Sequence, residues 1–468
     1  MNHLETSTLH KVMKSPIGAL FNNSLFEKIK NKNLPIEFKT AKIGAVARAE
    51  PNDINQFLRL LHINADDLDS ETINKIKKGL DEFSKNWQEF EKIKQQYTDV
   101  LWNSEPTVNP DQLVTLEEKR REISQTCRKP TKSLGFLAKT DFVPVVNFDI
   151  PPPKETLAKW EGAINNPNEI FGPPQNKPQI QESAKIPGPS GVEYLIKFKS
   201  PSPLMNDMVY ARIYEPTETD KTLPSFVFFF FLGMMNDQIK YWPEEEYIGR
   251  YLSSHGFMVA LIESPWHGRR EKKACFSGEP YVATAPVGLF TLYAAQSMET
   301  GIVIDWLRSI GASAVGIGGV SLGGIVSEHF ISRCGTYPHS MRPDMALLVA
   351  TSNHIAEVVL NSEISASLEL GKQVRDAGWD DRNLNRLKSL LDPNKEPGIP
   401  SENIFGIFGK NDTYIPYKYS VELMKEWNVS PNNITTWDSG HFGVLTRSIR
   451  KTDLQQILMK CMKKINRK

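Results

Sequence analysis

The strongest structural signal in this chain is Ala314-Val-Gly-Ile-Gly-Gly-Val-Ser-Leu-Gly-Gly-Ile-Val-Ser-Glu-His-Phe-Ile331. Residues 314–318 form a short apolar run that predicts a buried strand, and residues 324–331 can open a helix. A tight turn must join the two, with Ser321 at its centre between Gly319 and Gly323. The two glycines allow strand and helix to approach closely. The pattern therefore predicts an exposed serine hydroxyl beside free backbone N–H groups.

The composition is typical of a soluble globular protein. A length of 468 residues predicts two domains, and the chain is 40% hydrophobic and 24% charged. The net charge of +1 provides no overall attraction to nucleic acid or to an anionic membrane. The most apolar run, Phe226–Leu232, is too short to span a bilayer, so we expect a buried strand there and no stable membrane insertion.

The cysteines and the start of the chain bear on the compartment. Cys127, Cys275, Cys334 and Cys461 are widely spaced and form no C-x-x-C pair. This spacing favours free thiols in a reducing compartment over disulfides or metal ligation. Residues 1–5 lack the basic and apolar regions of a secretory signal. We therefore expect a cytoplasmic location.

The first part of the chain, residues 1–190, differs from the rest and predicts a helical region. Between Glu71 and Trp102, apolar residues recur every three or four positions, which indicates a long amphipathic helix. Docking on its own domain is favoured over binding a partner or a membrane. Residues 143–191 are rich in proline and predict an extended connection, at which we place the domain boundary.

Residues 191–468 alternate between strand and helix patterns, which predicts an α/β fold with a mostly parallel sheet flanked by helices. Eight strands are expected, the first two in hairpin-like succession. They lie near residues 192–198, 208–214, 226–232, 258–263, 314–318, 345–350, 403–409 and 434–437. The alternation stops at about residues 352–400, where we expect a cap insertion that acts either as a lid or as a packed helical segment.

A serine nucleophile needs a histidine base and a carboxylate that orients the base. In hydrolases with a G-x-S-x-G turn these follow in the order serine, acid, histidine. His441 is the one histidine beyond the penultimate strand, and it directly follows the last one. Asp412 follows an apolar strand, so its carboxylate should emerge at the carboxyl edge of the sheet. Asp438, three residues before His441, is the competing acid.

The remaining candidate residues would bind the substrate. An oxyanion hole needs two N–H donors, and we assign Leu322, directly after the serine, and Met234 beside Gly233 in the loop after the third strand. Met235, Trp266 and His267 are candidates for the substrate pocket. For the loop of residues 263–270, which contains Trp266 and His267, a purely structural role is the favoured alternative.

Over residues 192–468 the chain resembles the α/β-hydrolase superfamily, on the basis of residues 319–323, 409–412 and 440–442. This resemblance implies a Ser-His-Asp acyl hydrolase without a metal or an organic cofactor. The loop of residues 265–270 is similar to that of the abhydrolase domain-containing 18 group. The superfamily hosts many functions, so the resemblance implies no particular substrate.

Three functions follow from these patterns. The leading one is a serine hydrolase that cleaves carboxylic esters through an acyl-enzyme, an esterase or lipase acting on a small-molecule or lipid ester. The same triad would serve an amidase, a peptidase or an acyltransferase. The third is a non-enzymatic interaction protein that uses the amphipathic helix and the basic tail after His441. The oligomeric state stays open.

Overall fold

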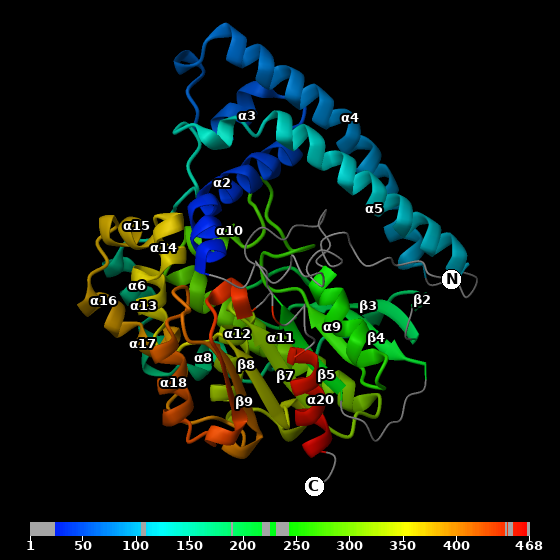
Figure 1. Cartoon of the computed structure of the whole chain (residues 1–468), viewed down its shortest axis with the longest axis vertical. Coiled ribbons are helices and arrows are strands. Elements are labelled where there is room, and N and C mark those ends of the chain that lie inside the picture. Colours follow the sequence, from blue (N-terminus) through cyan, green and yellow to red (C-terminus); the bar gives the residue numbers. More distant parts are fainter. Residues whose placement is uncertain are drawn as a thin grey trace.

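The computed structural model describes residues 24–103, 109–188, 191–217, 225–230, 243–444, 447 and 453–465. Figure 1 shows a sheet flanked by helices, with a group of N-terminal helices lying above it. Two of these helices, α4 Ser70–Leu101 and α5 Pro110–Ser133, run side by side and slope down toward the β2 and β3 edge of the sheet (Figure 1). The catalytic candidates lie in the part of the molecule built around the sheet.

The sheet has the strand order β1-β3-β4-β6-β5-β7-β8-β9-β10, with β2 paired to β3. From β6 onward the neighbouring strands are parallel, whereas β1, β2, β3 and β4 pair antiparallel and β4 pairs antiparallel with β6. This order, with β5 and β6 exchanged relative to the chain, is that of the α/β-hydrolase fold. The strands are β1 Gln181–Glu182, β2 Ile186–Gly188, β3 Gly191–Lys199, β4 Met208–Pro216, β5 Ser225–Phe230, β6 Val259–Ile262, β7 Val315–Val320, β8 Met345–Val349, β9 Ile404–Gly409 and β10 Ile434–Trp437.

The sheet has two more strands than the eight expected, because β1 and β2 extend it at the β3 edge. Both are very short and come from the proline-rich connection. Their apolar residues do not alternate over enough positions to produce a strand signal. They pair with β3 because that edge would otherwise present unpaired backbone groups.

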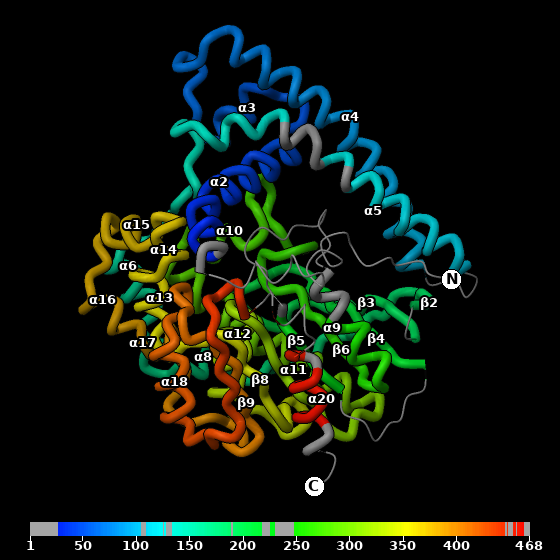
Figure 2. Tube along the Cα trace, in the orientation of Figure 1, coloured from blue at the N-terminus to red at the C-terminus, as the bar shows by residue number. Residues whose placement is uncertain are grey.

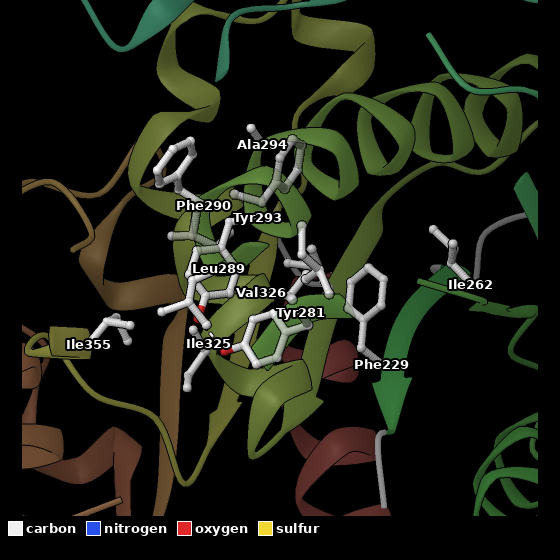
Figure 3. Packing of buried hydrophobic residues seen from close by; sticks show 14 of the residues in the cluster. Phe229, Ile262, Tyr281, Leu289, Phe290, Tyr293, Ala294, Ile325, Val326 and Ile355 are labelled. Atoms are coloured by element: carbon white, nitrogen blue, oxygen red, sulfur yellow. Dashed lines mark hydrogen bonds between the residues drawn. The ribbon is translucent and has the colours of Figure 1, made fainter. Parts of the chain in front are cut away.

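Helices cover both faces of the sheet. On one face, α11 and α12 pack against β5 and β7, and Figure 3 shows Phe229, Phe290 and Val326 among the buried side chains of this cluster. On the other face, α9 and α20 pack against Phe226, Phe228 and Leu347. Apart from the helices between β8 and β9, the described helices that follow β5 are α9 Pro243–Ser253, α10 Glu279–Ala283, α11 Val287–Ser309, α12 Leu322–Arg333, α18 Tyr417–Glu426 and α20 Asp453–Ile465.

Among the described residues, α11 is the one helix that is long and apolar enough to cross a membrane, by length and composition alone. In this structure 89% of its most apolar window is buried. Its side chains contribute to the main core, together with those of α12 and the strands. The burial is that of a core helix in a globular fold.

The N-terminal helices form a core of their own. They are α2 Ser24–Ala49, α3 Ile54–Leu60, α4 Ser70–Leu101 and α5 Pro110–Ser133. The apolar face of α4, with Phe83, Trp87 and Phe90, packs in a cluster that also contains residues of α2, α3 and α5. The amphipathic helix expected at residues 71–102 is therefore α4, and its apolar face packs within its own chain. Asp69 caps it by accepting a hydrogen bond from the Thr72 N–H at 2.7 Å.

The far end of α4 contacts the sheet. The Leu101 carbonyl accepts a hydrogen bond of 2.8 Å from the Ala184 N–H beside β1. The Trp102 ring lies 6.4 Å from the ring of Tyr210 on β4, and Lys197 of β3 lies over the Trp102 face. The helical region is thus attached to the sheet at this end, and α2 attaches it at the other.

The proline-rich stretch of residues 143–191 is not extended throughout. It contains α6 Pro153–Lys159, α7 Glu161–Asn165 and α8 Asn168–Phe171, besides β1 and β2. Pro153 is the first residue of α6, a position where the missing N–H of proline costs no helical hydrogen bond. Prolines that break a helix elsewhere therefore begin one here.

The segment between β8 and β9 is helical throughout much of its length. It comprises α13 Ile355–Asn361, α14 Glu363–Leu368, α15 Leu370–Asp376, α16 Asp381–Arg386 and α17 Lys388–Leu391. Leu368, Leu390 and Leu391 contribute to the main core. A gating role for this insertion stays a prediction. Short 3₁₀ helices lie at residues 65–67, 137–139, 334–336, 339–341, 401–403 and 431–433.

The central strand β5 carries much of the packing of the second face. Phe226 is fully buried, and its ring occupies the space where a side chain at Gly316 of β7 would otherwise lie. Truncation of Phe226 to alanine should lower the free energy of unfolding by about 3–5 kcal/mol, because it removes buried apolar area and leaves a cavity. Urea denaturation followed by tryptophan fluorescence measures the change. Ile310→Ala, at an exposed position, should change stability by less than about 0.5 kcal/mol, and equal effects of the two would contradict this packing.

Candidate active site

Ser321 lies between β7 and α12 with a backbone φ of 57° and ψ of −120°. A non-glycine residue in this region is strained, typically by about 1–3 kcal/mol. The strain is held by two hydrogen bonds of 2.9 Å, from the Ser321 N–H to the Val349 carbonyl and from the Ile325 N–H to the Ser321 carbonyl. This backbone conformation directs the Ser321 side chain away from both β7 and α12.

The flanking glycines are required by space. A β-carbon on Gly319 would overlap the Gly323 carbonyl, and one on Gly323 would overlap the Phe229 carbonyl of β5. These close contacts let α12 begin directly at the end of the strand. The close approach of strand and helix that the two glycines predicted from sequence is thus present in the structure.

Ser321, His441 and Asp412 form one chain of hydrogen bonds. The Ser321 Oγ lies 3.0 Å from the His441 Nε2, and the His441 Nδ1 lies 2.8 Å from the Asp412 Oδ2. Ser321 follows β7, Asp412 follows β9 and His441 follows β10, so all three lie at the carboxyl edge of the sheet. Residues 120 positions apart along the chain meet there because parallel strands end at the same edge.

Asp412 is held in one orientation by the backbone that follows it. Its Oδ1 accepts hydrogen bonds from the N–H groups of Tyr414 and Ile415, both at 2.9 Å. Its Oδ2 is left to accept the Nδ1–H of His441. The competing acid, Asp438, is exposed and accepts a hydrogen bond from the Asn411 side chain at 2.9 Å. The structure therefore brings Asp412, and not Asp438, to the histidine.

The His441 ring is also held by aromatic neighbours. Tyr414 stacks on it with ring centroids 4.9 Å apart and an interplanar angle of 16°. Phe442 meets the ring edge-on, at 5.8 Å and 85°. Because these contacts restrict the ring to one plane, Nδ1 stays directed at the carboxylate and Nε2 at the serine.

The electrostatic surroundings of His441 favour its charged form. Burial by itself would lower the pKa of the imidazole, but the charge and the hydrogen bond of Asp412 outweigh it, with a further contribution from the charge of Glu27. The pKa of His441 is therefore raised above its ordinary value. A base with this property accepts a proton from a serine hydroxyl more readily than an isolated imidazole does.

One of the two proposed oxyanion donors can be placed. Leu322 is the first residue of α12, where a backbone N–H has no acceptor within its own helix. The positive end of the helix dipole also lies here. Gly233, Met234 and Met235 lie outside the described residues, so the second donor and that part of the pocket stay predictions.

Trp266 and His267 lie in the loop that follows β6, and both are buried. The Trp266 carbonyl accepts a hydrogen bond from the Gly278 N–H at 2.9 Å, and the His267 Nδ1 lies 2.8 Å from the Pro265 carbonyl. Burial lowers the pKa of His267 to about 4, which keeps its ring neutral at neutral pH. These contacts fit the structural role that sequence favoured for the loop, and a role in the pocket stays a prediction.

Arg270, in the same loop, is part of a buried network. Its guanidinium lies 2.8 Å from Glu299 of α11 and 2.9 Å from Asp207. Ser200 donates a further hydrogen bond to Glu299 at 2.6 Å. The loop is thus fastened to α11 and to the segment between β3 and β4.

Sequence reasoning missed three residues beside the triad. Tyr414 stacks on His441, and its hydroxyl donates a hydrogen bond of 2.6 Å to the Asn31 side chain. Glu27 accepts a hydrogen bond of 2.8 Å from the Gly443 N–H, two residues after the histidine. Asn31 and Glu27 belong to α2 and are separated from the triad by hundreds of residues. Nothing in the local sequence of either position marks it, and only Tyr414, two residues after Asp412, lies near a motif.

No protein-family model matches this chain, and no curated protein matches it significantly. Similar solved structures include an acetyl xylan esterase from Paenibacillus sp. R4, which is 13% identical over 66% of this chain and 96% of its own, with a TM-score of 0.44. Acetyl xylan esterase 1 from Thermoanaerobacterium sp. is 15% identical over 67% of this chain and 96% of its own, with a TM-score of 0.42. A hyperthermophilic esterase from Pyrobaculum calidifontis is 15% identical over 74% and 97%, with a TM-score of 0.40. The fold assignment rests on the strand order described above, and likeness at this level carries no information on the substrate.

The contact between Asp412 and His441 predicts a measurable change in the imidazole. Asp412→Asn removes the negative charge that raises the pKa of His441, so the pKa should fall. Histidine-selective isotope labelling and NMR titration measure it, with a His441→Gln spectrum to assign the signal. Asp438→Asn is the matched control and should leave the pKa of His441 unchanged. The opposite pattern would make Asp438 the acid.

Proposed function

We propose that this protein is a serine hydrolase that cleaves carboxylic esters through an acyl-enzyme. The observation that supports the proposal is the continuous chain of hydrogen bonds from Asp412 through His441 to Ser321, with the serine on a strained turn at the start of a helix. A serine hydroxyl is a poor nucleophile unless a base removes its proton as it attacks. His441 is placed to do this, and Asp412 keeps the imidazole in the tautomer with its proton on Nδ1.

In the first half of the reaction, the Ser321 Oγ attacks the ester carbonyl and its proton passes to the His441 Nε2. The carbonyl oxygen becomes an anion that the Leu322 N–H and the α12 dipole stabilise. When this intermediate collapses, the bond to the alcohol oxygen breaks. The alcohol leaves with the proton held on His441, and the acyl group remains on Ser321.

In the second half, water replaces the alcohol. His441 takes a proton from the water as its oxygen attacks the acyl carbonyl, and a second oxyanion forms in the same place. Its collapse breaks the bond to the Ser321 Oγ, which regains the proton from His441. The carboxylic acid leaves and the triad returns to its starting state. Asp412 stays ionised throughout and stabilises the imidazolium in both halves.

The proposed base predicts the pH dependence of the rate. His441 must be neutral to accept the serine proton, and its pKa in the folded protein is raised above the reference value of 6.5. The value of kcat/KM should therefore rise with pH through an apparent pKa above 6.5 and be lost in acid. A pH profile with a short-chain p-nitrophenyl ester measures this limb. A rate that stays constant from pH 5 to pH 8 would contradict a histidine base.

The proposed nucleophile predicts both labelling and loss of turnover. A fluorophosphonate probe should label the wild-type protein, and Ser321→Ala should abolish labelling and lower kcat by roughly 10⁴-fold or more. Ser254→Ala, at an exposed position, is the control and should behave as wild type. Equal labelling of wild type and Ser321→Ala would rule out this nucleophile. Esters, anilides and thioesters of one acid, compared side by side, separate an esterase from an amidase or an acyltransferase.

A further inference from the structure

Helix α2 descends from the N-terminal helices to the carboxyl edge of the sheet, beside α10 and α14, as its blue trace shows in Figure 2. Its middle is fastened there by a buried ion pair, in which the Lys42 Nζ lies 2.8 Å from Glu279 of α10. The same ammonium donates a hydrogen bond of 3.1 Å to the Ala274 carbonyl. Phe38 packs on Phe276 with ring centroids 5.6 Å apart. These contacts set where the first turns of α2 lie.

The first turns of α2 contact the segment that carries His441. Residues 441–444 form the first helical turn after β10, and the first N–H groups of this turn have no acceptor within it. The Glu27 Oε1 accepts the Gly443 N–H at 2.8 Å, and the Phe442 N–H also interacts with this carboxylate. Glu27 therefore caps, from a distant part of the chain, the helical turn on which the proposed base sits. Gly440 permits the approach, because a β-carbon there would lie 2.7 Å from the Glu27 Cδ.

A second contact from α2 reaches the other side of the imidazole. The Asn31 Oδ1 accepts a hydrogen bond of 2.6 Å from the hydroxyl of Tyr414, the residue that stacks on His441. The Asn31 side-chain amide also donates to Glu363 of α14, which accepts the Thr413 hydroxyl at 2.7 Å. Glu27 and Asn31 are one helical turn apart and so lie on the same face of α2. This face holds both the backbone after His441 and the ring stacked on it.

The charges around the histidine define what Glu27 adds. Asp412 is hydrogen-bonded to the Nδ1 of His441, and Glu27 is a second carboxylate whose negative charge raises the pKa of the imidazole. Burial raises the pKa of Glu27, while the Gly443 N–H and the charge of His441 act in the opposite direction. Lys30 lies 5.8 Å from the Phe442 ring centroid and pairs with Glu37, and Glu363 and Glu37 act on Tyr414. Glu27 is a charged residue of α2 that accepts a hydrogen bond from the backbone of the segment that carries the proposed base.

From this geometry we propose that α2 is part of the catalytic apparatus and that Glu27 is a positioning residue for His441. Its carboxylate holds the helical turn of residues 441–444 and supplies a second negative charge that stabilises the imidazolium formed when Ser321 attacks. The catalytic part of this inference, the stabilisation of the imidazolium, rests on the function proposed above. It assigns to the N-terminal helical region a role in the reaction of the sheet domain.

The decisive variant is Glu27→Gln, which keeps an oxygen acceptor for the Gly443 N–H but removes the charge. On the alkaline plateau, kcat should fall about 10-fold with little change in KM, because the imidazolium loses part of its stabilisation. The pKa of His441 should fall, so the acid limb of the kcat/KM profile should move to lower pH. Glu27→Ala should lower kcat further, because it also leaves buried N–H groups without an acceptor. Unchanged kcat and an unchanged limb in both variants would overturn the proposal.

The matched control is Glu50→Gln, just beyond the other end of α2. Glu50 is also an N-terminal carboxylate in contact with the sheet domain, through an ion pair of 2.7 Å with the exposed Lys273. This variant should retain the wild-type kcat and pH profile. If Glu50→Gln lowers kcat as much as Glu27→Gln does, the effect is a general loosening of α2 and the positioning role is wrong.

A double-mutant cycle tests the contact without removing the carboxylate first. Gly440→Ala should displace Glu27 and lower kcat and the pKa of His441 as Glu27→Ala does. If the two act through the same contact, the double variant Glu27→Ala/Gly440→Ala should be no worse than Glu27→Ala alone. Full additivity of the two losses would contradict the contact. Thermal unfolding of each variant identifies any that fails to fold, and the remaining ones still decide the result.

NMR titration of His441 separates this proposal from the proposed function. If the wild-type protein hydrolyses no ester and takes no fluorophosphonate label, the ester hydrolase proposal fails. The pKa of His441 in Glu27→Gln is still measurable in that case. A pKa equal to that of wild type overturns the role of Glu27, and a lowered pKa supports it.

Discussion

The left-handed backbone of Ser321 is the constraint on which the rest of the site depends. A residue at φ 57° is strained, and it stays there because both sides of the turn are bonded, to Val349 on the neighbouring strand and to Ile325 in the helix that follows. The glycines at 319 and 323 remove the atoms that would prevent this approach. The hydroxyl and the Leu322 N–H are consequently presented together at the edge of the sheet. The stability of the surrounding sheet thus compensates for the strained backbone of Ser321.

The proposed base is held differently from the proposed nucleophile. Ser321 is positioned by its own backbone, whereas His441 lies on the first helical turn after β10. Its ring takes its direction from Asp412 and from the stacking of Tyr414, and its backbone is held by Glu27. Every one of these partners comes from outside the turn. A base held from several sides keeps its geometry as it gains and loses a proton, which is what acyl transfer requires of it.

The N-terminal helices therefore do more than extend the chain. Their core, with Phe83 and Phe90, makes them a packed unit, and the buried Lys42–Glu279 pair fixes α2 over the edge of the sheet. A buried ion pair contributes little net stability, but removal of either partner leaves a buried charge alone, so the pair specifies one docking geometry. That geometry places Glu27 and Asn31 at the triad. One of the two attachments between the N-terminal helices and the sheet region therefore lies where the proposed chemistry occurs.

The sequence by itself determined the local features. The elbow of residues 319–323, the alternation of strands and helices, and the order of Ser321, Asp412 and His441 follow from short-range rules of periodicity, glycine spacing and chain order. These rules act over a few residues, so a single sequence is sufficient to detect them. They left Asp438 open as an acid, and they missed β1, β2 and the short helices of the proline-rich stretch.

Only the tertiary structure decided which groups meet. The choice between Asp412 and Asp438 was made by their partners, because Asp412 bonds to His441 and Asp438 to Asn411. Glu27 and Asn31 reach the site because α2 packs over the edge of the sheet. Contacts between residues hundreds of positions apart depend on how whole elements pack, and no local pattern encodes that packing. The serine could be found from five residues. The contacts that position His441, the proposed base, depend on the whole fold.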